Sequence, residues 1–152
     1  MTSELTSRVD IDATPERVWQ VLMDLPAYAE WNPFITGAEG TFAVGGSPVL
    51  HVPAANALLR VTLRPTVLEV TPPRRLRLRL RMTRIGLPGM LDAEQTVTLI
   101  PGDDGGVRLW HEARFSGVLV PLLTRSLNRD RSPAYLAMND ALKERVERVQ
   151  RA

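Results

Sequence analysis

The strongest constraint on the fold of this chain is a strictly alternating segment at residues 75–82, with the sequence RLRLRLRM. Successive side chains of a β-strand point to opposite faces of a sheet, so the alternation predicts a strand with arginine on one face. Such a strand is typical of an antiparallel sheet with one solvated face and one covered face. The apolar positions of the covered face are Leu76, Leu78, Leu80 and Met82.

Other extended segments surround this strand, separated by glycine- and proline-rich turns between residues 37 and 117. The predicted strands lie near residues 38–44, 48–53, 59–70, 75–84, 92–100 and 107–116, and residues 5–11 have the spacing of a first strand. The sheet is therefore expected to have about seven strands.

Helical patterns precede and follow these strands. Thr14-Pro15-Glu16 predicts a helix start, because threonine can accept from a free amide and proline suits the first helical position. Pro26 is expected to end this helix, and a second short helical or turn segment follows at residues 28–35. Residues 121–130 are compatible with a short helix. A long last helix is predicted from residue 132 to about residue 150, with an apolar stripe of Tyr135, Met138, Leu142, Val146 and Val149.

Length and composition agree with a single domain, expected to span residues 1–152. Strands followed by helices predict an α+β fold with a largely antiparallel sheet. The absence of cysteine excludes disulfide scaffolds and thiolate chemistry. A net charge of only +2 and an aromatic content of 5% argue against nucleic acid as a partner. No signal sequence or integral membrane segment is recognisable, which predicts a soluble, cytoplasmic protein.

Several short motifs occur in an order that resembles a known family. The segment IDATPERVW at residues 11–19 is followed by Trp31-Asn32-Pro33. Further similar segments lie at residues 70–76, 106–109, 115–119 and 138–143. Together they resemble the START-like helix-grip (SRPBCC) proteins, the polyketide cyclase/dehydrase and Bet v 1-like group. The resemblance implies a curved antiparallel sheet wrapped around the long C-terminal helix, with two short helices after the first strand.

The resemblance also implies an apolar cavity between the sheet and the C-terminal helix that holds a small hydrophobic molecule. Family members are lipid or sterol carriers, hormone receptors or aromatase/cyclases, and no metal or organic cofactor is implied. The resemblance places Trp31, Phe34, Tyr135 and Met138 at the wall and mouth of this cavity. Ordinary filling of the core is the alternative explanation for these large side chains.

The hairpin between the last two predicted strands decides which polar residues face this cavity. A three-residue loop, Asp103-Asp104-Gly105, has glycine in the left-handed position and pairs Val97 with His111. A two-residue loop would pair Val97 with Glu112 and mix the faces. The first register is favoured because it places the apolar residues of both strands on one face, together with Gln95 and His111. That face is expected to lie against the helix.

Two interpretations of His111 remain open. In an apolar cavity its imidazole, beside the amide of Gln95, could orient a ligand or act as a general acid or base. Alternatively, it fills space and bonds to a neighbouring group. Asn139 lies next to the apolar stripe of the last helix. Solvent exposure is the favoured interpretation of this residue, and presentation of its amide to the cavity is the alternative.

The arginine face is interpreted as a solvated surface neutralised by Asp92, Glu94 and Glu112, with an oligomer contact or a polyanion site as alternatives. The apolar segment 115–123 is a candidate lid or subunit contact, so a homodimer is a further hypothesis.

The predicted function is binding of a small hydrophobic ligand, such as a lipid, an isoprenoid or a polyketide-like aromatic, by a carrier or sensor. The alternative is a polyketide cyclase or dehydratase that uses His111 as general acid or base. No metal site is expected, because only two histidines, far apart in the chain, are present. The predicted ligand contacts are Trp31, Phe34, Leu78, Leu80, Met82, Gln95, Val97, His111, Tyr135, Met138 and Leu142.

Overall fold

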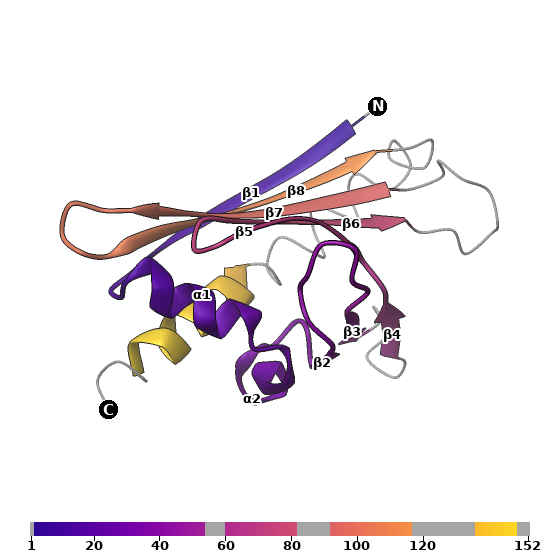
Figure 1. Ribbon diagram of the computed structural model, residues 1–152, viewed down its shortest axis with the longest axis horizontal. Coiled ribbons are helices and arrows are strands. Elements are labelled where there is room, and N and C mark those ends of the chain that lie inside the picture. The colour runs from indigo at the N-terminus through magenta and orange to yellow at the C-terminus, as the bar shows by residue number, and fades with distance from the viewer. Residues whose placement is uncertain (1, 54–59, 82–91, 117–135, 149–152) are drawn as a thin grey trace.

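The computed structural model describes residues 2–53, 60–81, 92–116 and 136–148, which form an α+β fold (Figure 1). The strands are β1 (Thr2–Ile11), β2 (Gly37–Glu39), β3 (Val49–Pro53), β4 (Arg60–Leu63), β5 (Thr66–Thr71), β6 (Arg75–Arg81), β7 (Asp92–Pro101) and β8 (Val107–Ser116). The helices are α1 (Pro15–Met23), the 3₁₀ helix η1 (Leu25–Ala27), α2 (Tyr28–Trp31) and a C-terminal helix of which residues 136–148 are described.

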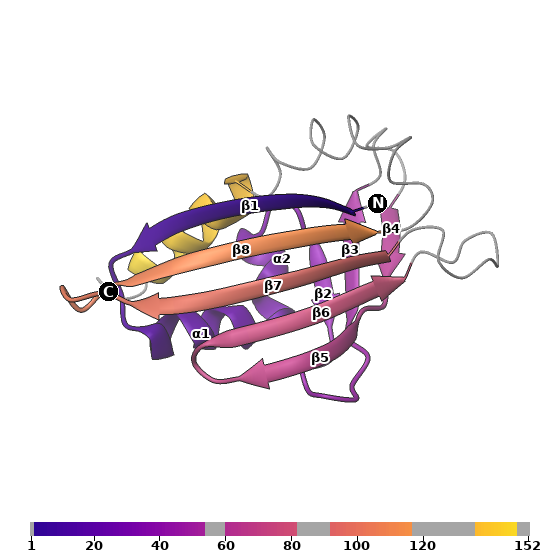
Figure 2. The same ribbon diagram turned by 90° about the horizontal axis from the view of Figure 1, so that it is seen from above.

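The strands form two antiparallel sheets. The large sheet has five strands in the order β1-β8-β7-β6-β5, and the small sheet has three in the order β2-β3-β4. In Figure 1 the large sheet is the upper layer, with α1, α2, the C-terminal helix and the small sheet beneath it. Seen from above, the strands of the small sheet run across the direction of the large sheet near one of its ends (Figure 2). This arrangement is the expected helix-grip fold.

The first helix begins as its sequence predicts and ends earlier. Thr14 caps α1, because its hydroxyl oxygen accepts from the backbone N–H of Arg17 at 3.3 Å. The helix ends at Met23, so the prediction that Pro26 terminates it was wrong by a few residues. Pro26 lies instead within η1, at an early position of a helical turn that a proline tolerates.

The alternating segment forms β6 as predicted, and Arg77 on its arginine face is ion-paired. The guanidinium of Arg77 contacts the carboxylates of Glu94 and Glu69. Glu94 was an expected partner, whereas Glu69, on the neighbouring strand β5, was not. On the opposite face Leu76 is fully buried, which confirms the division into a wet and a covered side.

Two predicted strands needed correction. The segment predicted as one strand near residues 59–70 is divided into β4, which pairs with β3, and β5, which pairs with β6. Pro65 stands at the division and has no N–H to donate to a ladder. The strand predicted near residues 38–44 is shortened to β2, which ends before Gly40, whose φ is +88°. The described residues therefore contain eight strands rather than about seven.

The hairpin between β7 and β8 has the predicted register. The N–H of Gly102 donates to the carbonyl of Gly106 at 2.9 Å, and Gly105 adopts a φ of +85° that favours glycine. Val97 consequently lies opposite His111, as the three-residue loop requires. Strand β8 is also paired on its other side with β1, where Ser7 faces His111.

The C-terminal helix packs its apolar stripe against the core, with Leu142 and Val146 fully buried and Met138 partly buried. Its polar side is hydrogen-bonded to the end of β1, where the ammonium of Lys143 donates to the backbone carbonyl of Asp10 at 2.9 Å. The predicted short helix at 121–130 lies outside the described residues. Within the described chain, none of the helices has the length and apolar character needed to span a membrane.

Candidate functional site

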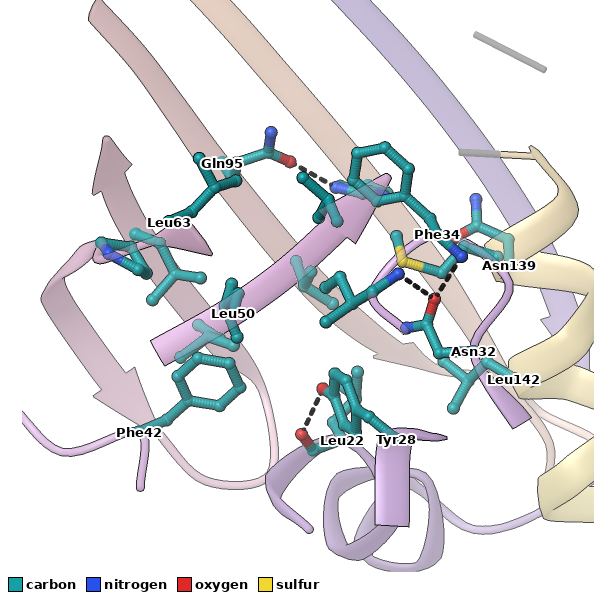
Figure 3. Close-up of a pocket in the computed structure, with 18 of the residues that line it drawn as sticks. Leu22, Tyr28, Asn32, Phe34, Phe42, Leu50, Leu63, Gln95, Asn139 and Leu142 are labelled. Atoms are coloured by element: carbon teal, nitrogen blue, oxygen red, sulfur yellow. Dashed lines mark hydrogen bonds between the residues drawn. The ribbon is translucent and has the colours of Figure 1, made fainter. Parts of the chain in front are cut away.

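An apolar cavity lies between the large sheet, the helices and the small sheet. The covered face of β6, β7 and β8 forms its roof, the C-terminal helix one wall, and the α1–α2 region with β3 and β4 the remaining walls. Figure 3 shows side chains from all of these elements converging on the same space. A cavity enclosed by so many elements is a property of the tertiary fold and not of any one segment.

Most residues that the sequence predicted for ligand contact line this cavity. They are Trp31, Phe34, Leu78, Leu80, Gln95, Val97, His111, Met138 and Leu142. Met82 and Tyr135, the other two, lie outside the described residues.

The sequence did not predict the contribution of the small sheet or of Asn32, and it favoured solvent exposure for Asn139. Leu50, Val52 and Leu63 line the cavity from β3 and β4, and Asn32 and Asn139 line it as well. The expectation that Asn139 faces solvent was wrong, because the residue is only 3% exposed. Its position one residue from Met138 on the helical stripe was the signal that it borders the covered side.

Four polar side chains form a cluster under the large sheet. The Nε2 atom of His111 lies 2.7 Å from Oε1 of Gln95, and the amide nitrogen of Asn139 donates to the hydroxyl of Ser7 at 2.7 Å. Asn139 also forms a side-chain hydrogen bond with His111. Strand pairing explains the cluster, because β8 places His111 between Val97 of β7 and Ser7 of β1.

His111 is electrically neutral at physiological pH. Its side chain is 5% exposed, and desolvation lowers the pKa of its imidazole from 6.5 to about 4. The hydrogen bond with Asn139 acts in the opposite direction but is the smaller effect. Burial also raises the pKa of Tyr28, whose hydroxyl donates to the carbonyl of Leu22 at 2.6 Å.

Asn32 occupies the opposite, helical side of the cavity. Its amide oxygen accepts from the backbone N–H groups of Phe34 at 2.9 Å and Ile35 at 2.8 Å. Its amide nitrogen is buried and has no hydrogen-bond partner, and the same holds for the indole N–H of Trp31. Figure 3 shows the amide nitrogen turned away from those backbone groups, among the other lining side chains.

The distribution of buried polar residues singles out this cavity. Within the described part of the chain, the buried polar or charged residues are Asn32, His111 and Asn139, and all three line it. None of the described lining residues is Asp, Glu, Lys or Arg. Burying polar groups in an apolar interior is costly unless they are paired. Their concentration here indicates a binding site that provides hydrogen bonds without a formal charge.

The cavity has a volume of about 110 Å³. An engineered apolar cavity of about 150 Å³ in another protein stays dry and takes up benzene. The observed volume therefore fits a compact molecule of about one small ring. A longer ligand would require the lining side chains to move apart.

Comparisons with known proteins agree with this fold. The family model for polyketide cyclase / dehydrase and lipid transport proteins matches residues 2–147. The chain is similar to the Zhui aromatase/cyclase from Streptomyces sp. R1128, with 20% identity, a TM-score of 0.76, and coverage of 100% of this chain and 98% of that one. It is also similar to a START superfamily protein from Mycobacterium smegmatis, with 18% identity, a TM-score of 0.71, and coverage of 96% and 98%. Among curated proteins, none matches this chain.

Proposed function

Because the chain belongs to the polyketide cyclase / dehydrase and lipid transport family, we propose that it binds a small, neutral, largely hydrophobic molecule as a carrier or sensor. The observation that carries this proposal is the cavity itself, into which three buried polar residues of the described chain are gathered. Ligand pockets are commonly apolar spaces with a few well-placed polar groups that fix orientation.

Burial of apolar ligand surface, worth about 25 cal/mol per Å², would supply the driving force for binding. The ligand is inferred to be neutral, because an ion entering the cavity would meet no opposite formal charge among the described lining residues. Hydrogen bonds from the amides and the imidazole would then select among neutral molecules of similar size. Small members of the lipid, isoprenoid and polyketide-like aromatic classes remain the candidates, and larger members would require the lining side chains to move apart.

Proton transfer by His111 in a cyclase or dehydratase is the second candidate function, because this imidazole lines the cavity. With a pKa of about 4, only about one molecule in a thousand carries the imidazolium that a general acid needs at pH 7. The neutral ring is also a weak base, since efficient general bases have a pKa near the working pH. These properties favour a carrier or sensor. Turnover that His111→Ala abolishes without loss of ligand binding would establish the enzyme instead.

Native mass spectrometry of the freshly purified protein, combined with solvent extraction and gas chromatography, tests the proposed function. We expect a neutral small molecule to co-purify in equimolar amount, or, where the ligand has been lost, saturable binding of added benzene detected by NMR. The proposal is contradicted by a protein that carries no small molecule and also fails to bind benzene up to the solubility limit of benzene.

A further inference from the structure

We propose that the ligand carries a hydrogen-bond acceptor oxygen, of the neutral ketone, aldehyde or ether kind, which accepts from the side-chain amide of Asn32. This inference rests on the proposed function, since it specifies the chemistry of the molecule bound in the same cavity.

The orientation of the Asn32 amide is fixed by its surroundings. Its oxygen accepts from two backbone N–H groups, those of Phe34 and Ile35, at 2.9 and 2.8 Å. A flipped amide would set its own N–H donors against these two donors and lose both bonds. The amide nitrogen is therefore held on the other side, among the cavity-lining side chains (Figure 3).

This fixed donor is left unsatisfied by the protein. Asn32 is 5% exposed, and its amide nitrogen has no hydrogen-bond partner. A buried N–H without a partner costs free energy that a suitable acceptor recovers. The contrast with Asn139 is informative, because that amide nitrogen already donates to the hydroxyl of Ser7. Of the two asparagines that line the cavity, Asn32 is the one whose donor is unpaired; neighbouring side chains cover this donor, so a ligand reaches it by displacing them.

The chemistry of the acceptor follows from the rest of the lining. A carboxylate or phosphate would also accept from Asn32, but it would bring a charge into a cavity whose described lining holds no cation. A carbonyl or ether oxygen on an apolar body satisfies the donor without that penalty. The cavity therefore discriminates against hydrocarbons that lack an acceptor, as well as against anions.

A matched pair of ligands and one substitution test the proposal. Cyclopentanone and methylenecyclopentane have nearly the same shape, and the second replaces the carbonyl oxygen by a CH₂ group. In Asn32→Asp one carboxylate oxygen can keep the bonds to the backbone of Phe34 and Ile35, while the amide donor is replaced by an oxygen. We expect the affinity ratio of ketone to alkene, measured by NMR titration, to fall about tenfold from the wild type to the variant, which corresponds to about 1.4 kcal/mol.

Comparing the ketone-to-alkene affinity ratio of the wild type with that of the variant cancels the different hydration of the two ligands. Binding of the alkene to the variant reports whether the variant retains its cavity. A second measurement uses only the wild-type protein, so it does not depend on folding of the variant. In a ¹⁵N–¹H spectrum, the side-chain amide protons of Asn32 should shift downfield with cyclopentanone and much less with methylenecyclopentane.

The possible outcomes separate this proposal from the proposed function. If both ligands bind and the ratio is the same in the wild type and in Asn32→Asp, with equal shifts of the amide signals, the cavity binds hydrophobic molecules but Asn32 does not select them. If neither ligand binds the wild-type protein, the inference about Asn32 fails, and the proposed function fails with it when the protein also carries no small molecule and does not bind benzene.

Discussion

Acidification from pH 7 to pH 4.5 is expected to lower the free energy of unfolding by about 2 kcal/mol through His111 alone. The cause is desolvation, which lowers the pKa of the folded imidazole from 6.5 to about 4. Between these two values the unfolded chain binds a proton that the folded protein does not. The contribution of His111 to the free energy of unfolding is therefore fully present above pH 6.5, the unfolded pKa. It is lost as the pH falls from 6.5 toward 4, the folded pKa.

Urea unfolding of the wild type and of His111→Gln at several pH values measures this effect. Glutamine is neutral throughout and can still hydrogen-bond to its neighbours, so the variant should lack this part of the acid sensitivity. The groups placed around the ring, Gln95, Asn139 and Ser7, are uncharged and do not titrate in this range. Parallel pH profiles of the two proteins, or an imidazole NMR titration with a midpoint near 6.5 in the folded wild type, would contradict the burial of a neutral ring.

Filling the cavity should abolish binding. Val97 lies on the covered face of β7, directly opposite His111, and lines the cavity. In Val97→Phe the added ring would occupy space that a ligand needs, and benzene affinity should fall at least a hundredfold, or by more than about 2.7 kcal/mol. The cost of overpacking is expected to be about 1–3 kcal/mol at most, because the ring enters an existing space.

Thr96→Phe is the matched control for this substitution. Thr96 is the preceding residue of the same strand and lines a groove on the opposite, charged face of the sheet. The same ring added there should leave benzene binding unchanged. Equal binding losses in both variants would mean that the aromatic ring acts through general damage to β7. Undiminished binding in a folded Val97→Phe would mean that the ligand sits elsewhere.

The parts of the fold that were predictable are those set by local chemistry. Alternation of arginine and leucine defines the two faces of β6 wherever that strand lies in the molecule. Gly105 limits the hairpin to two loop lengths, and the apolar face that the three-residue loop produces selects the register that brought Gln95 and His111 together on the covered face. Both inferences depend on neighbours in the sequence and not on distant segments.

The parts that were missed depend on contacts between distant segments. The predicted single strand near residues 59–70 ignored Pro65, and nothing local indicated that β4 joins a separate small sheet which then closes the cavity. Asn139 is adjacent to the apolar stripe, and only its distant partners Ser7 and His111 make its burial favourable. Asn32 stood in a recognised motif, yet its free donor became apparent only once its oxygen was seen to bond to the following backbone.

A crystal of the ligand-free protein exposed to xenon gas tests most directly whether an unfilled apolar space exists between the sheet and the helices. Xenon enters dry apolar cavities of about this size without requiring polar contacts. Xenon density beside Val97 and Leu142, absent from Val97→Phe, is the expected result. A cavity filled by the protein's own side chains, with no xenon between Val97 and Leu142, would contradict the proposed site.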